Sequence, residues 1–105
     1  MDRTRVPRYG RHATQIRARP GESFVLELPA RATGGYRWQV TRVPAVAVLQ
    51  EERIRPSGPA LGAASVQEFE FVATGVGEGA LVIEHRRSWE SSASEQLDLN
   101  IIVEP

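Results

Sequence analysis

Short runs in which apolar and polar residues alternate are the feature that most constrains the fold of this chain. Phe24, Leu26 and Leu28 fall on one face of the first clear run, and the run from Tyr36 to Val40 repeats the pattern. Alternation with a period of two is typical of a β-strand with one buried face. The Gly-Gly pair between the two runs permits backbone conformations that a Cβ would forbid. The sequence therefore predicts a strand, a turn-rich loop and a second strand.

The same pattern recurs along the chain, and no segment has the periodicity of an amphipathic helix. We expect about seven strands, at residues 13–17, 22–28, 36–42, 46–54, 67–71, 80–87 and 97–103. An all-β, immunoglobulin-like antiparallel β-sandwich buries strands of this number and length. The chain has no cysteine, so we expect Trp38 to hold its place in the core by packing alone.

The length of 105 residues fits a single domain. We expect the domain to cover residues 13–105 and residues 1–12, which carry four arginines, to form a flexible basic arm. No apolar segment of signal-peptide type follows these arginines, so the sequence as written predicts a cytoplasmic protein. A periplasmic or secreted location is expected instead if the sequence has been trimmed.

The composition argues against several classes of function. The 13 basic residues, all arginine, balance 13 acidic residues, so no net field draws the chain to nucleic acid or to a membrane. No apolar run is long enough to span a bilayer. His12 and His85 lack metal-ligand spacing with carboxylates, and no serine occupies a glycine-flanked elbow. We therefore expect no enzyme activity, no cofactor and no metal.

The positions of the long loops suggest a binding surface. These loops, at residues 29–35, 55–65 and 87–94, follow the second, fourth and sixth predicted strands. Loops after alternate strands of a sandwich emerge at the same end. We therefore expect the three loops to lie together, and the short turns at Pro20-Gly21, Pro44 and Gly75–Gly79 to lie at the other end.

Individual side chains allow more than one interpretation. Trp89 stands in a polar loop beside arginine, where it either contacts a partner or folds back on the end of the sandwich. His85 is in phase with the apolar residues of its strand, which favours a partly buried histidine. The Glu51-Glu52 pair and the Glu68/Glu70 pair are interpreted as solvated faces.

The loop residues resemble the motifs of the chagasin family of cysteine peptidase inhibitors. The stretch Leu28–Trp38 is similar to that family's pattern of Leu-Pro, then Asn-Pro-Thr-Thr-Gly, an aromatic residue and a further Trp. Gly62 matches the first glycine of its Gly-x-Gly-Gly motif. Arg87 and Trp89 match the ends of its Arg-Pro-Trp motif, in which Ser88 replaces the proline.

The resemblance implies a non-covalent inhibitor with an immunoglobulin-like fold, whose three loops enter the active-site cleft of papain-family cysteine peptidases. Carried over to this sequence, it implies a peptidase-binding set of Arg31, Ala32, Thr33, Gly34, Gly35, Tyr36, Gly62, Ala63, Ala64, Arg87, Ser88 and Trp89. Loss of two family prolines gives the free loops more conformations, which is expected to weaken binding. We expect a monomer.

Two alternatives to peptidase inhibition remain open at this point. The chain could be an immunoglobulin-like interaction module that uses an exposed edge strand. It could also keep the inhibitor fold and bind another partner.

Overall fold

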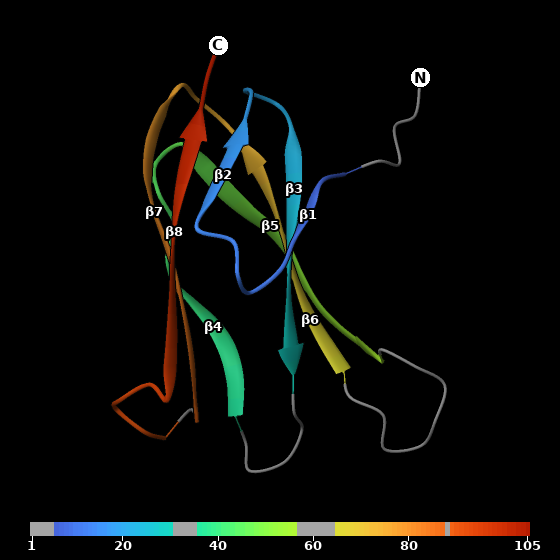
Figure 1. Ribbon diagram of the computed structural model, residues 1–105, viewed down its shortest axis with the longest axis vertical. Helices are drawn as coiled ribbons and strands as arrows, with labels where there is room; N and C mark the ends of the chain where they lie inside the picture. Colours follow the sequence, from blue (N-terminus) through green and yellow to red (C-terminus); the bar gives the residue numbers. More distant parts are fainter. Residues whose placement is uncertain (1–5, 31–35, 57–64, 88) are drawn as a thin grey trace.

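The computed structural model of the chain describes residues 6–30, 36–56, 65–87 and 89–105. These residues contain eight strands and no helix: β1 (Arg8–Tyr9), β2 (Gln15–Ala18), β3 (Ser23–Ala30), β4 (Tyr36–Arg42), β5 (Ala47–Pro56), β6 (Ser65–Ala73), β7 (Gly77–Arg87) and β8 (Glu95–Val103). Seven of them correspond to the predicted strands, and β1 is additional. The strands form two layers (Figure 1), so the predicted immunoglobulin-like β-sandwich is confirmed.

The first sheet has the order β1-β3-β6-β5 and the second the order β2-β8-β7-β4. The four pairings among β3 to β8 are antiparallel, as predicted, whereas β1 runs parallel to β3 and β2 runs parallel to β8. No hairpin turn joins β1 or β2 to its partner, so the direction of these pairs is not set by a turn. The expectation of a purely antiparallel sandwich therefore differs from the structure at these two edges.

The core lies between the sheets and is built from the alternating residues that the sequence indicated. Phe24, Leu26 and Leu28 of β3 are buried, and the ring of Phe24 stacks on Phe71 of β6 with centroids 5.3 Å apart. Truncating such a buried aromatic to alanine costs about 3–5 kcal/mol. The apolar faces of the strands thus supply the packing that fixes the two sheets against each other.

The basic segment at the amino terminus is attached to the first sheet from Pro7 to Tyr9. The Val25 amide donates to the Pro7 carbonyl at 2.9 Å, and Arg8 and Tyr9 pair with Val25 and Leu26. The flexible arm predicted over residues 1–12 is therefore not free at these positions. Two residues are too few to produce an alternating pattern, which explains why the sequence did not indicate β1. Residues 1–5 lie outside the described part of the chain.

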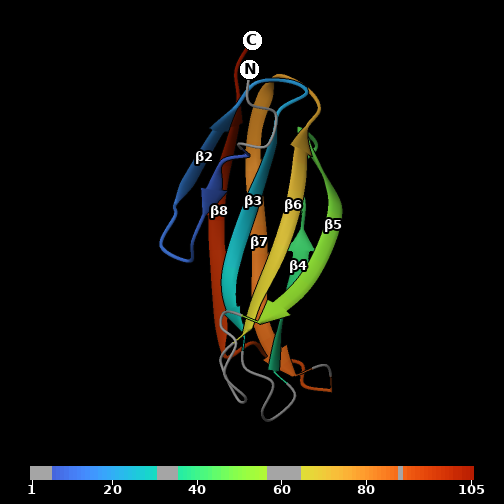
Figure 2. The same cartoon turned by 90° about the vertical axis from the view of Figure 1, so that its right-hand side faces the viewer.

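The two ends of the sandwich differ in how the chain reverses direction. At one end, called the loop end below, β3, β5 and β7 finish and β4, β6 and β8 begin (Figures 1 and 2). At the other, called the turn end, three short connections meet: the Gly21 amide donates to the Ala73 carbonyl, and the Thr74 amide donates to the Val46 carbonyl, both at 2.8 Å. The predicted placement of the short turns at one end is confirmed.

Candidate functional site

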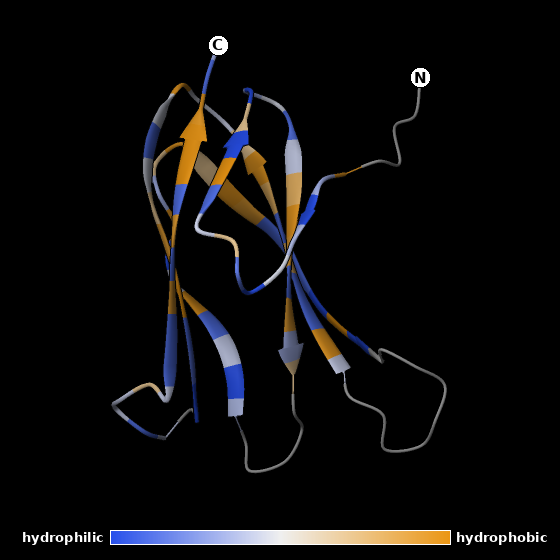
Figure 3. Cartoon of the chain, in the orientation of Figure 1, coloured by the Kyte–Doolittle hydropathy of each residue, from blue (hydrophilic) through white to orange (hydrophobic). Residues whose placement is uncertain are grey.

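The strands bring the borders of all three predicted loops to the loop end. Ala30 and Pro56 both pair with Ser65, which joins the borders of the first and second loops in the first sheet. Tyr36 pairs with Arg87 in the second sheet, which joins the borders of the first and third loops. Figure 3 shows hydrophilic residues where β4 and β8 begin at this end. The grouping predicted from alternate strands is confirmed for these borders.

Three of the predicted site residues lie in the described part of the chain: Tyr36, Arg87 and Trp89. Arg31, Ala32, Thr33, Gly34, Gly35, Gly62, Ala63, Ala64 and Ser88 lie outside it. Tyr36 begins β4, Arg87 ends β7, and Trp89 follows in the connection to β8. The side chain of Trp89 is 70% exposed, which is the greatest exposure of any large hydrophobic residue in the described ranges. It does not fold back into the core, so the second interpretation of this residue is wrong.

The described site residues belong to a column of stacked side chains that runs from the core to the loop end. We call this set the aromatic column: Trp38, His85, Tyr36, Arg87 and Trp89. The His85 ring lies 4.6 Å from the Trp38 ring and 5.3 Å from the Tyr36 ring, between centroids. The Arg87 guanidinium carbon lies 4.6 Å from the Tyr36 ring centroid and 5.8 Å from that of Trp89. Both of the latter distances are within the range of cation–π attraction.

Trp38 anchors the buried end of the aromatic column through three hydrogen bonds. Its indole N–H donates to the Pro29 carbonyl at 2.8 Å, which ties β4 to the end of β3 across the two sheets. Its backbone N–H donates to Gln67 Oε1 at 2.8 Å, and Gln67 Nε2 donates to its carbonyl at 3.1 Å. Trp38 is buried as predicted, but it is not held by packing alone. The sequence did not indicate that Gln67 points into the core. There its side chain forms hydrogen bonds with the backbone of β4, which is an edge strand of the second sheet.

Short contacts close the connection between β7 and β8 on the exposed side of the aromatic column. The Ser94 amide and hydroxyl both donate to the His85 carbonyl at 2.8 Å. The Glu90 amide donates to the Arg87 carbonyl at 3.1 Å, and the Glu90 carboxylate pairs with Arg87 Nε at 3.3 Å. These contacts tie Glu90 and Ser94 to the end of β7.

The outer face of the first sheet carries a cluster of arginine and glutamate side chains beneath the loop end. We call it the arginine–glutamate cluster: Arg8, Arg53, Arg55, Glu27, Glu51, Glu68 and Glu70. Its centre is Glu68, which is 2% exposed and accepts hydrogen bonds from Arg55 Nε at 2.7 Å, Arg53 Nε at 2.9 Å and Arg8 Nη1 at 2.9 Å. The interpretation of Glu68 as solvated is therefore wrong, because arginines of β1 and β5 cover its face of the sheet.

The ionisation of Glu68 reflects two opposing effects. Burial of the carboxyl group acts to raise its pKa, but the hydrogen bonds from Arg55, Arg53 and Arg8 outweigh burial and lower the pKa of Glu68 to about 2. The carboxylate is thus ionised over the whole physiological range. It joins β1, β5 and β6 just below the loop borders.

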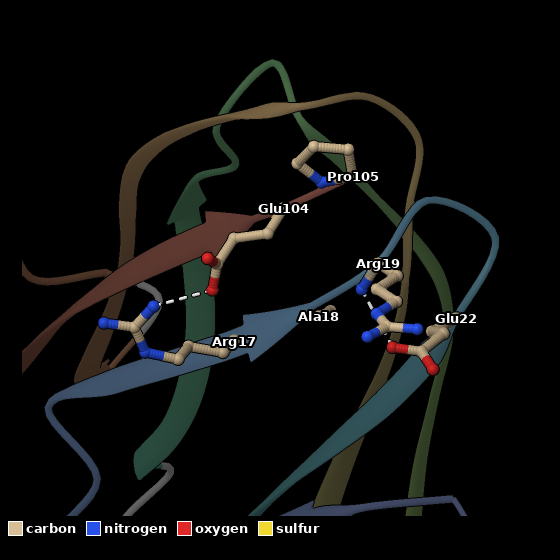
Figure 4. Close-up of a pocket in the computed structure, with 6 residues that line it drawn as sticks. All are labelled: Arg17, Ala18, Arg19, Glu22, Glu104 and Pro105. Atoms are coloured by element: carbon tan, nitrogen blue, oxygen red, sulfur yellow. Dashed lines mark hydrogen bonds and ion pairs between the residues drawn. The ribbon is translucent and has the colours of Figure 1, made fainter.

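A hollow at the turn end is lined by Arg17, Ala18, Arg19, Glu22, Glu104 and Pro105 (Figure 4). There, Arg17 pairs with Glu104 at 2.6 Å and the Arg19 amide donates to Glu22 at 2.8 Å. Within the described ranges no group of three or more His, Asp or Glu residues is placed to hold a metal ion, and no helix could cross a membrane.

Sequence reasoning missed two features of this end, His85 as the link in the aromatic column and Glu68 as the centre of the cluster. His85 carried a partial signal, since it is in phase with Leu81 and Ile83 on its strand, but its pairing with Trp38 is seen only in the structure. Glu68 carried none, because its partners come from positions 13, 15 and 60 residues away in the chain.

Comparison with solved structures shows that other proteins share this fold. The cysteine protease inhibitor EhICP2 from Entamoeba histolytica aligns with a TM-score of 0.80 at 15% identity, over 94% of this chain and 96% of that one. Amebosin aligns with a TM-score of 0.71 at 20% identity, over 95% and 99%. PbICP-C, solved in complex with falcipain-2, aligns with a TM-score of 0.60 at 13% identity, over 95% and 92%.

Comparison by sequence gives the family. No curated protein matches the chain. Residues 17–103 match the model of the family described as chagasin family peptidase inhibitor I42, which covers the sandwich except for β1 and the first two residues of β2. The match extends over β3 to β8 and includes all three loops with the residues that carried the resemblance. The chain therefore belongs to the chagasin family of peptidase inhibitors.

Proposed function

We propose that the chain inhibits papain-like cysteine peptidases reversibly and competitively, by inserting the loop end into the active-site cleft. The observation that carries the proposal is the placement of Trp89. This aromatic ring is exposed at the loop end, next to Arg87 and on the same end as the borders of the other two loops. Tryptophan and arginine are the residues most often found at the energetic centre of an interface.

The rigidity of the loop borders supports tight binding by this end. The aromatic column and the hydrogen bonds of Trp38 and Ser94 fix the described borders before any partner arrives. A preformed surface loses little conformational freedom on docking, which is how protease inhibitors of standard interface size reach high affinity. Thr33 and Gly62, which lie outside the described residues, belong to the proposed contact surface in the first and second loops.

The chemistry available to the chain favours blocking of the cleft over covalent trapping. The sequence has no cysteine, so it offers no thiol that could form a disulfide with the catalytic cysteine of a peptidase. Inhibition by occupation of the cleft needs no reaction at either partner. We therefore propose a binding protein without catalytic activity of its own.

A titration against papain with a fluorogenic peptide substrate tests the proposal. We expect the apparent KM to rise with inhibitor concentration while kcat stays constant, activity to return on dilution, and the mass of the chain to stay unchanged after long incubation. Loss of peptidase activity that survives dilution and denaturation would contradict the reversible mechanism. No inhibition of papain or of other papain-family peptidases at micromolar concentration would favour an immunoglobulin-like interaction module instead.

A further inference from the structure

We propose that His85 is a positioning residue for the loop end, because its ring sets the position of Tyr36 and Arg87 and, through Arg87, that of Trp89. The inference rests on the proposed function and extends it to a side chain that does not itself contact the peptidase. None of the motifs that carried the family resemblance includes His85.

Among the described residues, His85 links the buried and the exposed half of the aromatic column, because its ring contacts both Trp38 and Tyr36. Trp38 is 3% exposed and fixed by hydrogen bonds to Pro29 and Gln67. The His85 ring lies tilted against this fixed ring at 4.6 Å and stacks on Tyr36 at 5.3 Å, between centroids. Arg87 then rests on Tyr36 and reaches Trp89. A flat ring at position 85 therefore transmits the rigid position of Trp38 to the exposed residues.

Ser94 holds the His85 ring in this orientation. The Ser94 hydroxyl donates its proton to the His85 carbonyl at 2.8 Å and lies 3.3 Å from His85 Nδ1. Which of the two atoms, Ser94 Oγ or His85 Nδ1, donates in this second contact depends on the tautomer of the imidazole. When the imidazole is protonated, Nδ1 carries a proton and can donate it to the Ser94 oxygen.

The charged groups around the ring are consistent with a structural use of the imidazole. Arg87 lies two residues further along β7 and Glu95 is the strand partner of His85 on β8. Glu95 also pairs with Arg11. The stacking contacts are available in both protonation states, so the positioning role does not depend on a single charge state of His85.

Three substitutions at position 85 separate the flat ring from the space it fills. His85→Phe keeps the flat ring and removes the contact between Nδ1 and Ser94, His85→Leu fills similar space without a π face, and His85→Ala removes both the ring and the space it fills. Val103→Ala is the stability control, because Val103 is buried at the turn end. His12→Ala controls for loss of a histidine, since His12 is exposed.

Two quantities are measured for each variant: the inhibition constant for papain and the NMR order parameter of the Trp89 indole N–H. We expect His85→Ala and His85→Leu to raise the inhibition constant about tenfold and to lower the order parameter, because a stacking contact is lost. We expect His85→Phe to stay within about threefold of the parent and to keep the order parameter high. Val103→Ala lowers the melting temperature and changes neither readout.

The two readouts also separate this inference from the function on which it rests. If the parent fails to inhibit papain, the proposed function fails, and the order parameter alone then decides whether His85 positions Trp89. An order parameter that stays at the parent value in His85→Leu overturns the positioning role. Equal losses of inhibition in His85→Phe and His85→Leu also overturn it, because the flat ring would then be irrelevant. His85→Leu decides the matter if His85→Ala does not fold.

Discussion

The two ends of the sandwich are held by different kinds of contact. At the turn end, short connections pack backbone against backbone: Pro44 is buried against Gly79, and amides of two turns donate across to neighbouring strands. At the loop end, the strands are held by contacts between side chains. These are the aromatic column in the second sheet and the arginine–glutamate cluster on the first.

This difference separates stability from recognition. At the turn end the connections are held by backbone hydrogen bonds and by the contact between Pro44 and Gly79, and among the described residues the exposed side chains there include no aromatic ring. Side-chain contacts at the loop end fix the strand borders while leaving Trp89 70% exposed. We therefore expect changes at the turn end to alter the free energy of unfolding, and changes at the exposed loop end to alter inhibition.

The largest effect on inhibition is expected from Trp89→Ala. Truncating an aromatic residue at the centre of an interface costs about 2–4 kcal/mol, which corresponds to roughly 30- to 700-fold in the dissociation constant. The melting temperature should not change, because most of the ring is exposed. Inhibition constants against papain and thermal unfolding measured on the same samples check both expectations. An unchanged inhibition constant would show that the loop end does not bind through this ring.

Glu68→Gln tests whether a change near the loop end can affect stability alone. We expect a loss of about 2–3 kcal/mol in the free energy of unfolding at pH 7, because three arginines lose their shared carboxylate. The inhibition constant should stay within about twofold, since Glu68 is buried on the outer face of the first sheet. A large loss of inhibition with unchanged stability would contradict the division between the ends.

The pH dependence of the same variant follows from the lowered pKa of Glu68. Because the folded pKa, about 2, is below the ordinary value of 4.5, the ionised carboxylate stabilises the fold above pH 4.5. This contribution is lost as the pH falls from 4.5 towards 2. Urea unfolding of the parent and of Glu68→Gln should therefore differ most at neutral pH and converge near pH 2. A constant difference across this range would show that the charge of Glu68 is not what stabilises the fold.

Gly79→Ala is the matching test at the turn end. A Cβ at this position would lie 2.8 Å from Pro44 Cβ, so the turn carrying Pro44 has to shift. Overpacking of this kind costs about 1–3 kcal/mol. Gly75→Ala is a suitable control, because a Cβ there meets nothing within 4 Å. Denaturant unfolding should show the loss for Gly79→Ala with inhibition unchanged, and a weakened inhibitor would indicate coupling between the ends.

The smallest effect is expected from Thr33→Ala in the first loop. The substitution removes a hydroxyl and a methyl group, so the expected loss of binding is about 1 kcal/mol, from one hydrogen bond. The inhibition constant should therefore rise by about fivefold, without a change in melting temperature. A loss greater than that of Trp89→Ala would move the centre of the interface from the third loop to the first.

Much of this architecture could be predicted from the sequence because the relevant signals are local. Alternating residues such as Phe24, Leu26 and Leu28 indicated strands and their buried faces, and both properties follow from the period of two in a strand. Glycine and proline marked the turns. The order of the strands then placed the long loops at one end, and the motif residues around Tyr36, Arg87 and Trp89 indicated the family.

Only the tertiary structure decided which side chains meet at the loop end. Glu68 alternates with buried residues as a solvated residue would, and its burial depends on arginines supplied by β1 and β5. His85 becomes the link between Trp38 and Tyr36 only when β7 pairs with β4 in this register. Periodicity reports which face of a strand is buried, but contacts between strands depend on sheet order and register, which arise from packing of the whole chain.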